Sequence, residues 1–211
     1  MTKWSTLLVF KRKSSIDLQI YRRAELPILL KKLKLNGIGG EIGVQNGYFS
    51  DKILADSNLS LLYSIDPWIH WEIEEYDKDG ANLSQKEQDI IYFNALHLLR
   101  KYKARSICLK LKSENAVGLF KDESLDFVYI DAQHSYEKCK QDLELWYPKI
   151  KQNGIFSGHD YLTLEQKKLT NRLHYGVKEA VDEFIKDLDC TLYVTKAPLK
   201  EEFPSWYFIK K

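Results

Sequence analysis

The segment from Gly39 to Gly47, GGEIGVQNG, constrains the fold of this chain more strongly than any other. An acidic residue, Glu41, ends a short apolar run, and Gly43 and Gly47 break the chain immediately after it. Glycine tolerates the positive φ angles that a tight turn requires. A strand, a glycine turn and a helix in this order are typical of the nucleoside-binding edge of a Rossmann-like sheet. The alternative interpretation is the same local structure without a ligand.

The spacing of the glycines argues against a dinucleotide. Dinucleotide-binding turns use Gly-x-Gly-x-x-Gly to bring the backbone against a pyrophosphate, whereas this chain has Glu-x-Gly-x-x-x-Gly. A nucleoside ligand without phosphate, such as S-adenosylmethionine, fits this turn better. We expect Gly43 and Gly47 to let the backbone approach the amino-acid end of that ligand, and Glu41 to order the same end.

Two polar residues beyond the turn are further candidates for binding this ligand. Asp66 ends an apolar run over residues 61–66 and lies 19 residues after Gly47, close to the offset of roughly 20 at which an acid meets ribose hydroxyls. The alternative role for Asp66 is to form a turn before Pro67. Ser113 follows a predicted strand over 106–111, where its hydroxyl either bonds to adenine or caps the next helix.

Two more predicted strands end in polar residues. Asp131 follows the apolar run 125–130, and the run 154–161 contains Gly158, His159, Asp160 and Tyr161. Because ligands of open α/β sheets bind at the carboxyl ends of the strands, we expect four strand ends to converge on one site. Asp131 is therefore also a candidate cofactor-binding residue.

Four motifs in order carry a family resemblance, namely EIGVQNGYFS at 41–50, IDPW at 65–68, DFVYIDAQHSYE at 126–137 and GHDY at 158–161. Together they resemble the class I S-adenosylmethionine-dependent methyltransferases of the macrocin O-methyltransferase type, over about residues 37–188. The resemblance implies a Rossmann-like α/β fold with a seven-stranded, mainly parallel sheet, helices on both faces and an antiparallel C-terminal strand. One departure is Ala132, where the family usually has glycine.

The chain is predicted to contain an N-terminal helical extension over 1–36 and a single methyltransferase domain over 37–211. Leu26, Leu29, Leu30 and Leu33 have helical spacing, which suits a helix packed on the sheet or closing the cofactor site. Residues 67–84 are the main irregular insertion, and long loops inside compact domains are commonly functional. Trp68 within it either stacks near the ligand or anchors the loop to the core.

Two histidines are candidates for the base that removes a proton from a methyl acceptor. We favour His134, three residues after Asp131, because an imidazole pKa of about 6.5 suits proton abstraction near neutrality. His159 is the second candidate. A purely structural alternative is that His134 caps the following helix.

A divalent metal ion is a second possible means of activating the acceptor. Asp131 and Asp160 end adjacent strands, so their carboxylates are candidate ligands for Mg²⁺. Metal-dependent relatives bind an ion at corresponding strand ends, but the further ligand expected beside Asp160 is replaced by Tyr161. If His159 substitutes for it, Mn²⁺ is favoured over Mg²⁺.

Composition excludes some classes of partner. Lys and Arg total 32 against 30 Asp and Glu, so a formal charge of +2 gives no case for nucleic-acid or membrane binding. Three widely separated cysteines indicate a reducing compartment, and we expect a cytoplasmic protein. A homo-oligomer is possible, and the expected partner is a small-molecule acceptor.

The sequence therefore predicts an S-adenosylmethionine-dependent O-methyltransferase acting on a small hydroxylated acceptor, such as a sugar or natural-product hydroxyl. Two alternatives remain open. One is an NAD-dependent oxidoreductase or epimerase on a similar fold, and the other is a non-catalytic nucleoside-binding subunit.

Overall fold

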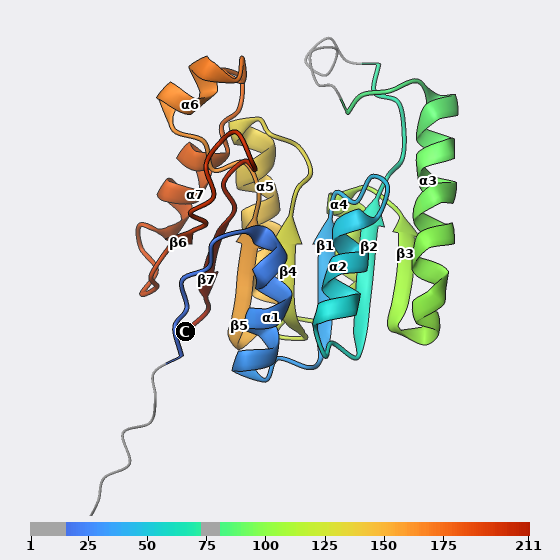
Figure 1. The fold of residues 1–211 in the computed structure, drawn as a ribbon, viewed down its shortest axis with the longest axis horizontal. Coiled ribbons are helices and arrows are strands. Elements are labelled where there is room, and N and C mark those ends of the chain that lie inside the picture. The colour runs from blue at the N-terminus through green and yellow to red at the C-terminus, as the bar shows by residue number, and fades with distance from the viewer. Residues whose placement is uncertain (1–15, 73–80) are drawn as a thin grey trace, which may run out of the picture.

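A single seven-stranded sheet organises the molecule (Figure 1). The computed structural model describes residues 16–72 and 81–211. The strand order is β3-β2-β1-β4-β5-β7-β6, with β1 to β5 parallel and β7 antiparallel to both β5 and β6. The strands are β1 (Ile38–Ile42), β2 (Leu61–Asp66), β3 (Ser106–Lys110), β4 (Leu125–Ile130), β5 (Ile150–Gly158), β6 (Tyr193–Val194) and β7 (Trp206–Ile209). The predicted fold class is confirmed.

Helices cover both faces of this sheet and produce two separate layers of core. One layer contains buried side chains of α1 and α2, and the other those of α5 and α7. The helices are α1 (Leu26–Leu33), α2 (Tyr48–Asp56), α3 (Gln85–Leu99), α4 (Ser113–Ala116), α5 (Tyr136–Trp146), α6 (Leu164–Leu169) and α7 (Val177–Ile185). Short 3-10 turns are η1 (Arg23–Glu25), η3 (Arg100–Arg105), η4 (Val117–Leu119) and η5 (Tyr147–Lys149).

The central strand β4 shows why the sheet is sandwiched in this way. All six of its residues, LDFVYI, are buried, as expected for a parallel strand covered on both faces. Its one acidic residue, Asp126, accepts a hydrogen bond from the backbone N–H of Gly37 at 2.5 Å and pairs with Lys151 at 2.5 Å. The buried charge is thereby partnered at the amino end of the sheet, far along the strand from the site described below.

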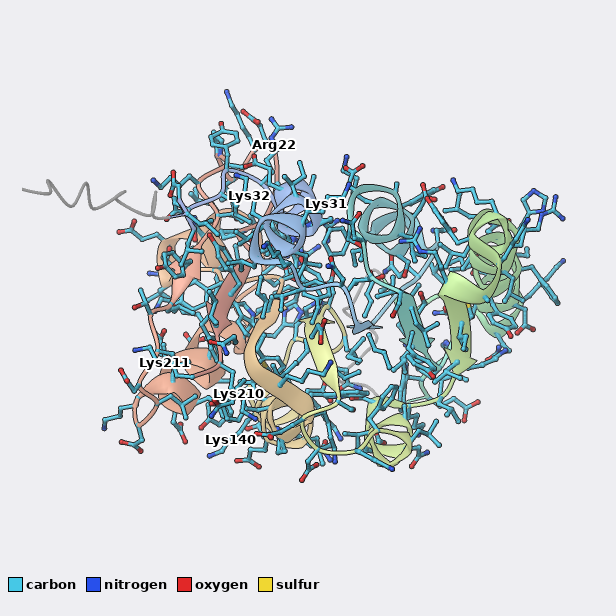
Figure 2. The ribbon with its side chains drawn as sticks, turned by 90° about the horizontal axis from the view of Figure 1, so that it is seen from below. Arg22, Lys31, Lys32, Lys140, Lys210 and Lys211 are labelled. Carbon is cyan, nitrogen blue, oxygen red and sulfur yellow. The ribbon has the colours of Figure 1, made fainter. Side chains whose placement is uncertain are left out.

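The N-terminal segment packs onto the sheet, as its leucine spacing predicts. Leu26, Leu29 and Leu30 of α1 are buried in the same core layer as α2. Lys31 and Lys32 are exposed on α1 (Figure 2). The first 15 residues of the expected extension, and residues 73–80 of the expected insertion, lie outside the described residues.

The structure differs from the expected elements in two places that border the site. Strand β5 begins at Ile150 and ends at Gly158, so His159 and Asp160 lie beyond the strand. Helix α6 was not expected, although Thr163 and Gln166 form a capping box at its start, a pattern that marks helix N-termini. Among residues 16–72 and 81–211, no helix is both long enough and apolar enough to cross a membrane.

Candidate functional site

A cavity of about 400 Å³ opens at the carboxyl ends of the parallel strands. Open α/β sheets bind ligands at this edge, where successive strands diverge. Residues following β1, β2, β3 and β4 contribute to its wall. Of the four strand ends expected to converge, those of β1, β2 and β4 line the cavity, whereas His159 and Asp160 after β5 line a neighbouring recess. The cavity wall includes Gly43, Gln45, Asp66, Trp71, Lys112, Ser113, Glu114, Asp131, Ala132, Gln133, Lys138 and Asp142.

The glycine turn after β1 is held against β4. Gly43 has a φ of +86°, and a Cβ on this residue would lie 1.9 Å from the carbonyl oxygen of Asp131. Gly47 has a φ of +80° and immediately precedes α2. Gly43 therefore serves first to let two strand ends approach each other, and it also lines the cavity. No described contact tests the expected approach to a ligand.

Asp66 organises this turn with its carboxylate. Its Oδ2 accepts hydrogen bonds from the backbone N–H groups of Val44, at 2.8 Å, and Gln45, at 3.0 Å, while Oδ1 accepts from the N–H of Trp68 at 2.7 Å. The turn-forming alternative for Asp66 is thus realised, and Asp66 also lines the cavity. The ribose role stays a prediction, compatible with the lone pairs that the carboxylate retains.

Glu41 does not line the cavity. It lies within β1, so its side chain stands perpendicular to the sheet and meets α2, where its carboxyl accepts a hydrogen bond from the Ser50 hydroxyl. Only 2% of Glu41 is exposed, and burial raises the pKa of its carboxyl to about 8, against the lowering effect of Ser50. The structure thus places Glu41 beneath the turn, inside the protein.

The buried Glu41 should make stability depend on pH. Between about pH 4.5, where Glu41 ionises in the unfolded chain, and about pH 8, only the folded protein keeps this proton, so its contribution is lost as pH rises. We expect Glu41→Gln to match the wild type at pH 5 and to exceed its unfolding free energy by about 2–4 kcal/mol at pH 8.5. Urea unfolding at both pH values measures this, with exposed Glu144→Gln as the control.

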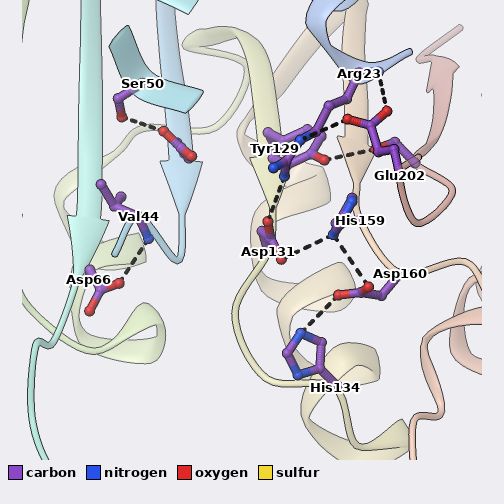
Figure 3. A network of polar contacts seen from close by, with 12 residues as sticks. Arg23, Val44, Ser50, Asp66, Tyr129, Asp131, His134, His159, Asp160 and Glu202 are labelled. Atoms are coloured by element: carbon purple, nitrogen blue, oxygen red, sulfur yellow. Dashed lines mark hydrogen bonds and ion pairs between the residues drawn. The ribbon is translucent and has the colours of Figure 1, made fainter. Parts of the chain in front are cut away.

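Four side chains form a polar cluster beyond β4 and β5 (Figure 3). Nε2 of His134 lies 2.9 Å from Oδ2 of Asp160, and Nδ1 of His159 lies 3.3 Å from Oδ1 of the same carboxylate. The same Nδ1 lies 3.6 Å from Oδ1 of Asp131. The ring of His134 also stacks on Tyr175, at a centroid distance of 4.1 Å. The predicted base and metal-ligand candidates are therefore neighbours.

The two histidines of the cluster differ in their environment. Burial by itself would lower the pKa of His159, but the carboxylates of Asp131 and Asp160 outweigh it and raise this pKa to about 9. His159 is consequently a cation at neutral pH. The hydrogen bonds from His134 and His159 in turn hold the pKa of Asp160 well below its usual range, although burial opposes this effect.

Arg23, which was not among the sequence candidates, reaches this cluster from the N-terminal segment. Its Nη1 donates to Oδ2 of Asp131 at 3.1 Å, and its Nε lies 3.3 Å from Glu202 in the loop before β7. Asp131 thus faces two cations, Arg23 and His159. Arg23 and Asp131 are 108 positions apart, so no local sequence pattern predicts this contact.

The cluster adjoins the cavity without lying in it. Asp131, Ala132 and Gln133 line both the cavity and a small neighbouring recess, whereas His134, His159 and Asp160 line only the recess. The segment 131–133 therefore borders both the cavity and the cluster, and a ligand in the cavity would lie next to the cluster across this segment.

Two tryptophans after β2 have different roles. Trp68 is 1% exposed, donates from Nε1 to the carbonyl oxygen of Gln45 at 3.0 Å and is absent from the cavity wall. It therefore follows the anchoring alternative. Trp71 lines the cavity instead, with Nζ of Lys112 at 4.4 Å from its ring centroid. Sequence reasoning gave no means of choosing between them.

Ser113 lines the cavity, but its hydroxyl is already engaged. It donates to Oδ1 of Asp142 and accepts from Nε1 of Trp146 at 2.8 Å. Asp142 lies on the buried face of α5 together with Cys139, Leu143 and Trp146. An acidic residue inside a stripe of helical core positions is the one sequence signal that was available for Asp142.

Comparison with known proteins agrees with this geometry. A family model described as a methyltransferase domain matches residues 41–161, which include the turn and the four cluster residues. A search of curated protein sequences finds no match.

Solved structures share the fold. The O-methyltransferase TomG from Streptomyces achromogenes, involved in tomaymycin synthesis and solved with S-adenosylmethionine, has 12% identity and a TM-score of 0.61, over 89% of this chain and 78% of that one. An O-methyltransferase from Bacillus cereus, solved with S-adenosylhomocysteine, has 17% identity and a TM-score of 0.58, over 89% and 80%. An rRNA methylase from Streptococcus thermophilus has 13% identity and a TM-score of 0.54, over 87% and 96%.

Proposed function

Because this chain belongs to the methyltransferase domain family, we propose that it transfers a methyl group from S-adenosylmethionine to a hydroxyl group of a small molecule. The observation that carries the proposal is the juxtaposition of the cavity at the strand ends with the histidine and carboxylate cluster behind residues 131–133. One accommodates the methyl donor, and the other provides a base for the acceptor. The cavity and the cluster both lie within the single methyltransferase domain that we propose for residues 37–211.

The cavity suits the methyl donor in size and polarity. Pockets for small molecules occupy roughly 300–1,000 Å³ and combine apolar walls with a few polar groups. We place the amino-acid end at the turn of Gly43, the ribose at Asp66 and the adenine toward Ser113, which follows the order β1, β2, β3 of adjacent strands. The two O-methyltransferases named above were solved with S-adenosylmethionine or its product, which supports the same donor here.

The reaction is an in-line displacement at the methyl carbon. The acceptor oxygen forms a bond to that carbon while the bond to sulfur breaks, its electron pair returning to sulfur and converting the sulfonium to a thioether. The hydroxyl proton must leave, and His134 is the base that we propose. Asp160, at 2.9 Å, stabilises the imidazolium that results. His159 is already protonated near neutrality, so it acts as a fixed cation between two carboxylates.

The base role of His134 makes a kinetic prediction. We expect His134→Gln to lower the rate of methyl transfer by about 100-fold or more, because general bases contribute roughly that factor. The affinity for S-adenosylhomocysteine should be unchanged, since His134 does not line the cavity. Single-turnover transfer from labelled S-adenosylmethionine to an acceptor found by screening hydroxylated compounds measures the rate. His97→Gln, exposed on α3, is the matched control. Weakened donor binding with a normal rate would contradict the role.

A divalent cation is the second candidate for activating the acceptor. Asp131, His134 and Asp160 each offer one ligand atom, all within 4.8 Å of one another, and this mixed set suits Mn²⁺ better than Mg²⁺. A bound ion would lower the pKa of a coordinated hydroxyl. The charge of the cluster, however, does not fit an added cation, because Arg23 and His159 already face the two carboxylates. This charge balance favours the histidine base.

A direct measurement of Mn²⁺ binding distinguishes the histidine base from the divalent cation. We expect calorimetric titration with Mn²⁺ at pH 7 to show no binding tighter than about millimolar, since two cations already balance the carboxylates. EDTA should leave the affinity for S-adenosylhomocysteine unchanged. Micromolar Mn²⁺ binding that Asp160→Asn abolishes would instead establish a metal site at the cluster and favour the metal-assisted reaction.

The proposal as a whole is tested by titrating S-adenosylhomocysteine into the purified protein by calorimetry, in parallel with NAD. Saturable binding of the first and none of the second is the expected result. Binding of NAD alone would support the oxidoreductase alternative. The finer assignment to the macrocin type, and to sugar or natural-product hydroxyls, rests on the motif resemblance, since a shared fold accommodates acceptors as different as those of the structures compared above.

A further inference from the structure

The carboxylate of Asp142 is an unusual component of the cavity wall. It is 6% exposed and belongs to the buried face of α5, yet it lines the cavity. Buried carboxylates are normally fully hydrogen-bonded, because removing a charged oxygen from water without a partner costs free energy. Asp142 thus calls for an explanation that core packing does not provide.

The hydrogen bonds of Asp142 engage only one of its two oxygens. Oδ1 accepts from the hydroxyl of Ser113, which in turn accepts from Nε1 of Trp146 at 2.8 Å. This chain fixes the orientation of the carboxylate. Within residues 16–72 and 81–211, no hydrogen bond or ion pair reaches Oδ2, and Lys138, which also lines the cavity, acts on this carboxylate only as a more distant charge. A rigidly held acceptor at a cavity wall, lacking a protein donor, is suited to a ligand that brings a donor of its own.

The position of Asp142 identifies the part of the ligand concerned. The proposed donor extends from the turn after β1, past Asp66 at the end of β2, toward Ser113 just after β3. Asp142 is tied to Ser113, so it lies at the end of this path, where the purine would be. Adenine carries an exocyclic amine with two N–H donors, whereas a 6-oxo purine carries a carbonyl oxygen at the same place.

We infer that Asp142 accepts a hydrogen bond from the exocyclic amine of adenine and is the residue that selects an adenine nucleoside over a 6-oxo purine. The inference rests on the proposed function and assigns a specificity role within that same site. Ser113, the sequence candidate for the adenine contact, becomes the residue that positions Asp142. A carboxylate repels a carbonyl oxygen that faces it. Adenine is therefore favoured because it gains a hydrogen bond, and a 6-oxo purine is disfavoured because its carbonyl oxygen is repelled.

The experiment compares S-adenosylhomocysteine with S-inosylhomocysteine, in which the amine is replaced by a carbonyl oxygen. Calorimetric titrations at pH 8 keep Asp142 ionised, since burial raises the pKa of its carboxyl only to about 6. The wild type should bind the adenine compound at least tenfold more tightly, as expected for a hydrogen bond to a charged acceptor. Asp142→Asn, which conserves volume and offers an amide donor to the carbonyl, should shrink this preference at least tenfold.

The matched control is Asp122→Asn, the same change at a carboxylate that is 70% exposed and pairs with Lys149 outside the site. It should retain the wild-type preference, and thermal unfolding verifies that both variants fold. Equal binding of the two compounds by the wild type would overturn the inference. An equal loss of affinity for both compounds in Asp142→Asn would also overturn it, because that result is expected if the carboxylate only maintains the structure. In either case the proposed function stands, whereas a wild type that binds neither compound defeats both.

Discussion

Gly43→Ala is expected to destabilise the folded protein severely. The added methyl group would lie 1.9 Å from the carbonyl oxygen of Asp131, and the φ of +86° is one that alanine adopts only under strain. The atom it meets belongs to the backbone at the end of β4, so no side chain can rotate away. Relieving the overlap means separating β1 from β4 where Asp131 N–H donates to the Ile42 carbonyl at 2.7 Å.

We expect Gly43→Ala to cost more than about 4 kcal/mol of unfolding free energy, a large part of the 5–15 kcal/mol typical of a domain. Urea unfolding of the soluble fraction measures the loss. Gly118→Ala is the matched control, because a Cβ there meets nothing within 4 Å and its effect should lie within about 1 kcal/mol of zero. Equal stability of the two variants would show that β1 and β4 do not approach each other as described.

The second large effect is expected for Asp66→Ala, which should reduce the affinity for S-adenosylhomocysteine by at least 100-fold. Three backbone N–H groups, of Val44, Gln45 and Trp68, donate to this carboxylate. Without it the glycine turn loses the contacts that hold its shape, and a ligand loses the proposed acceptor for its ribose hydroxyls. Each orphaned donor costs about 1–3 kcal/mol where it is shielded from water.

Calorimetry on Asp66→Ala and Asp66→Asn separates the two contributions. The asparagine keeps one acceptor oxygen for the turn but lacks the charge and second oxygen, so it should lose less stability than alanine while still binding the ligand more weakly than the wild type. Asp56→Ala, at the C-terminal end of α2, is the control for losing a partly exposed aspartate that pairs with Lys52. Unchanged affinity in Asp66→Ala would leave Asp66 a turn-forming residue alone.

Some of the candidate site could be predicted from the sequence because its signals are local. A strand that ends in an acid or a glycine turn shows in a few consecutive letters, and parallel strands bring their carboxyl ends to one edge. Gly43, Asp66, Ser113 and Asp131 accordingly line the cavity. The same signals misplaced Glu41, because a residue one position before the strand end points to a face of the sheet and there meets α2.

Other features depend on contacts between segments far apart in the chain. The proposed choice of His134 over His159 as base rests on the carboxylates around each ring. The high pKa of His159 arises only when β4 and β5 place Asp131 and Asp160 beside it. Arg23 reaches Asp131 from the N-terminal segment by packing alone. No spacing rule within one element encodes such pairings.

The sequence by itself determined the alternation of strands and helices, the parallel sheet and the edge at which the cavity opens, since hydrophobic periodicity and turn residues act within a few positions of one another. The tertiary structure alone decided which polar side chains face the cavity, which are buried beneath it and which carry charge. Those properties depend on solvation and on neighbours brought together by folding. Asp142 illustrates the difference, because its sequence position is that of a core residue and only the packing of α5 against α4 opens its carboxylate to the cavity.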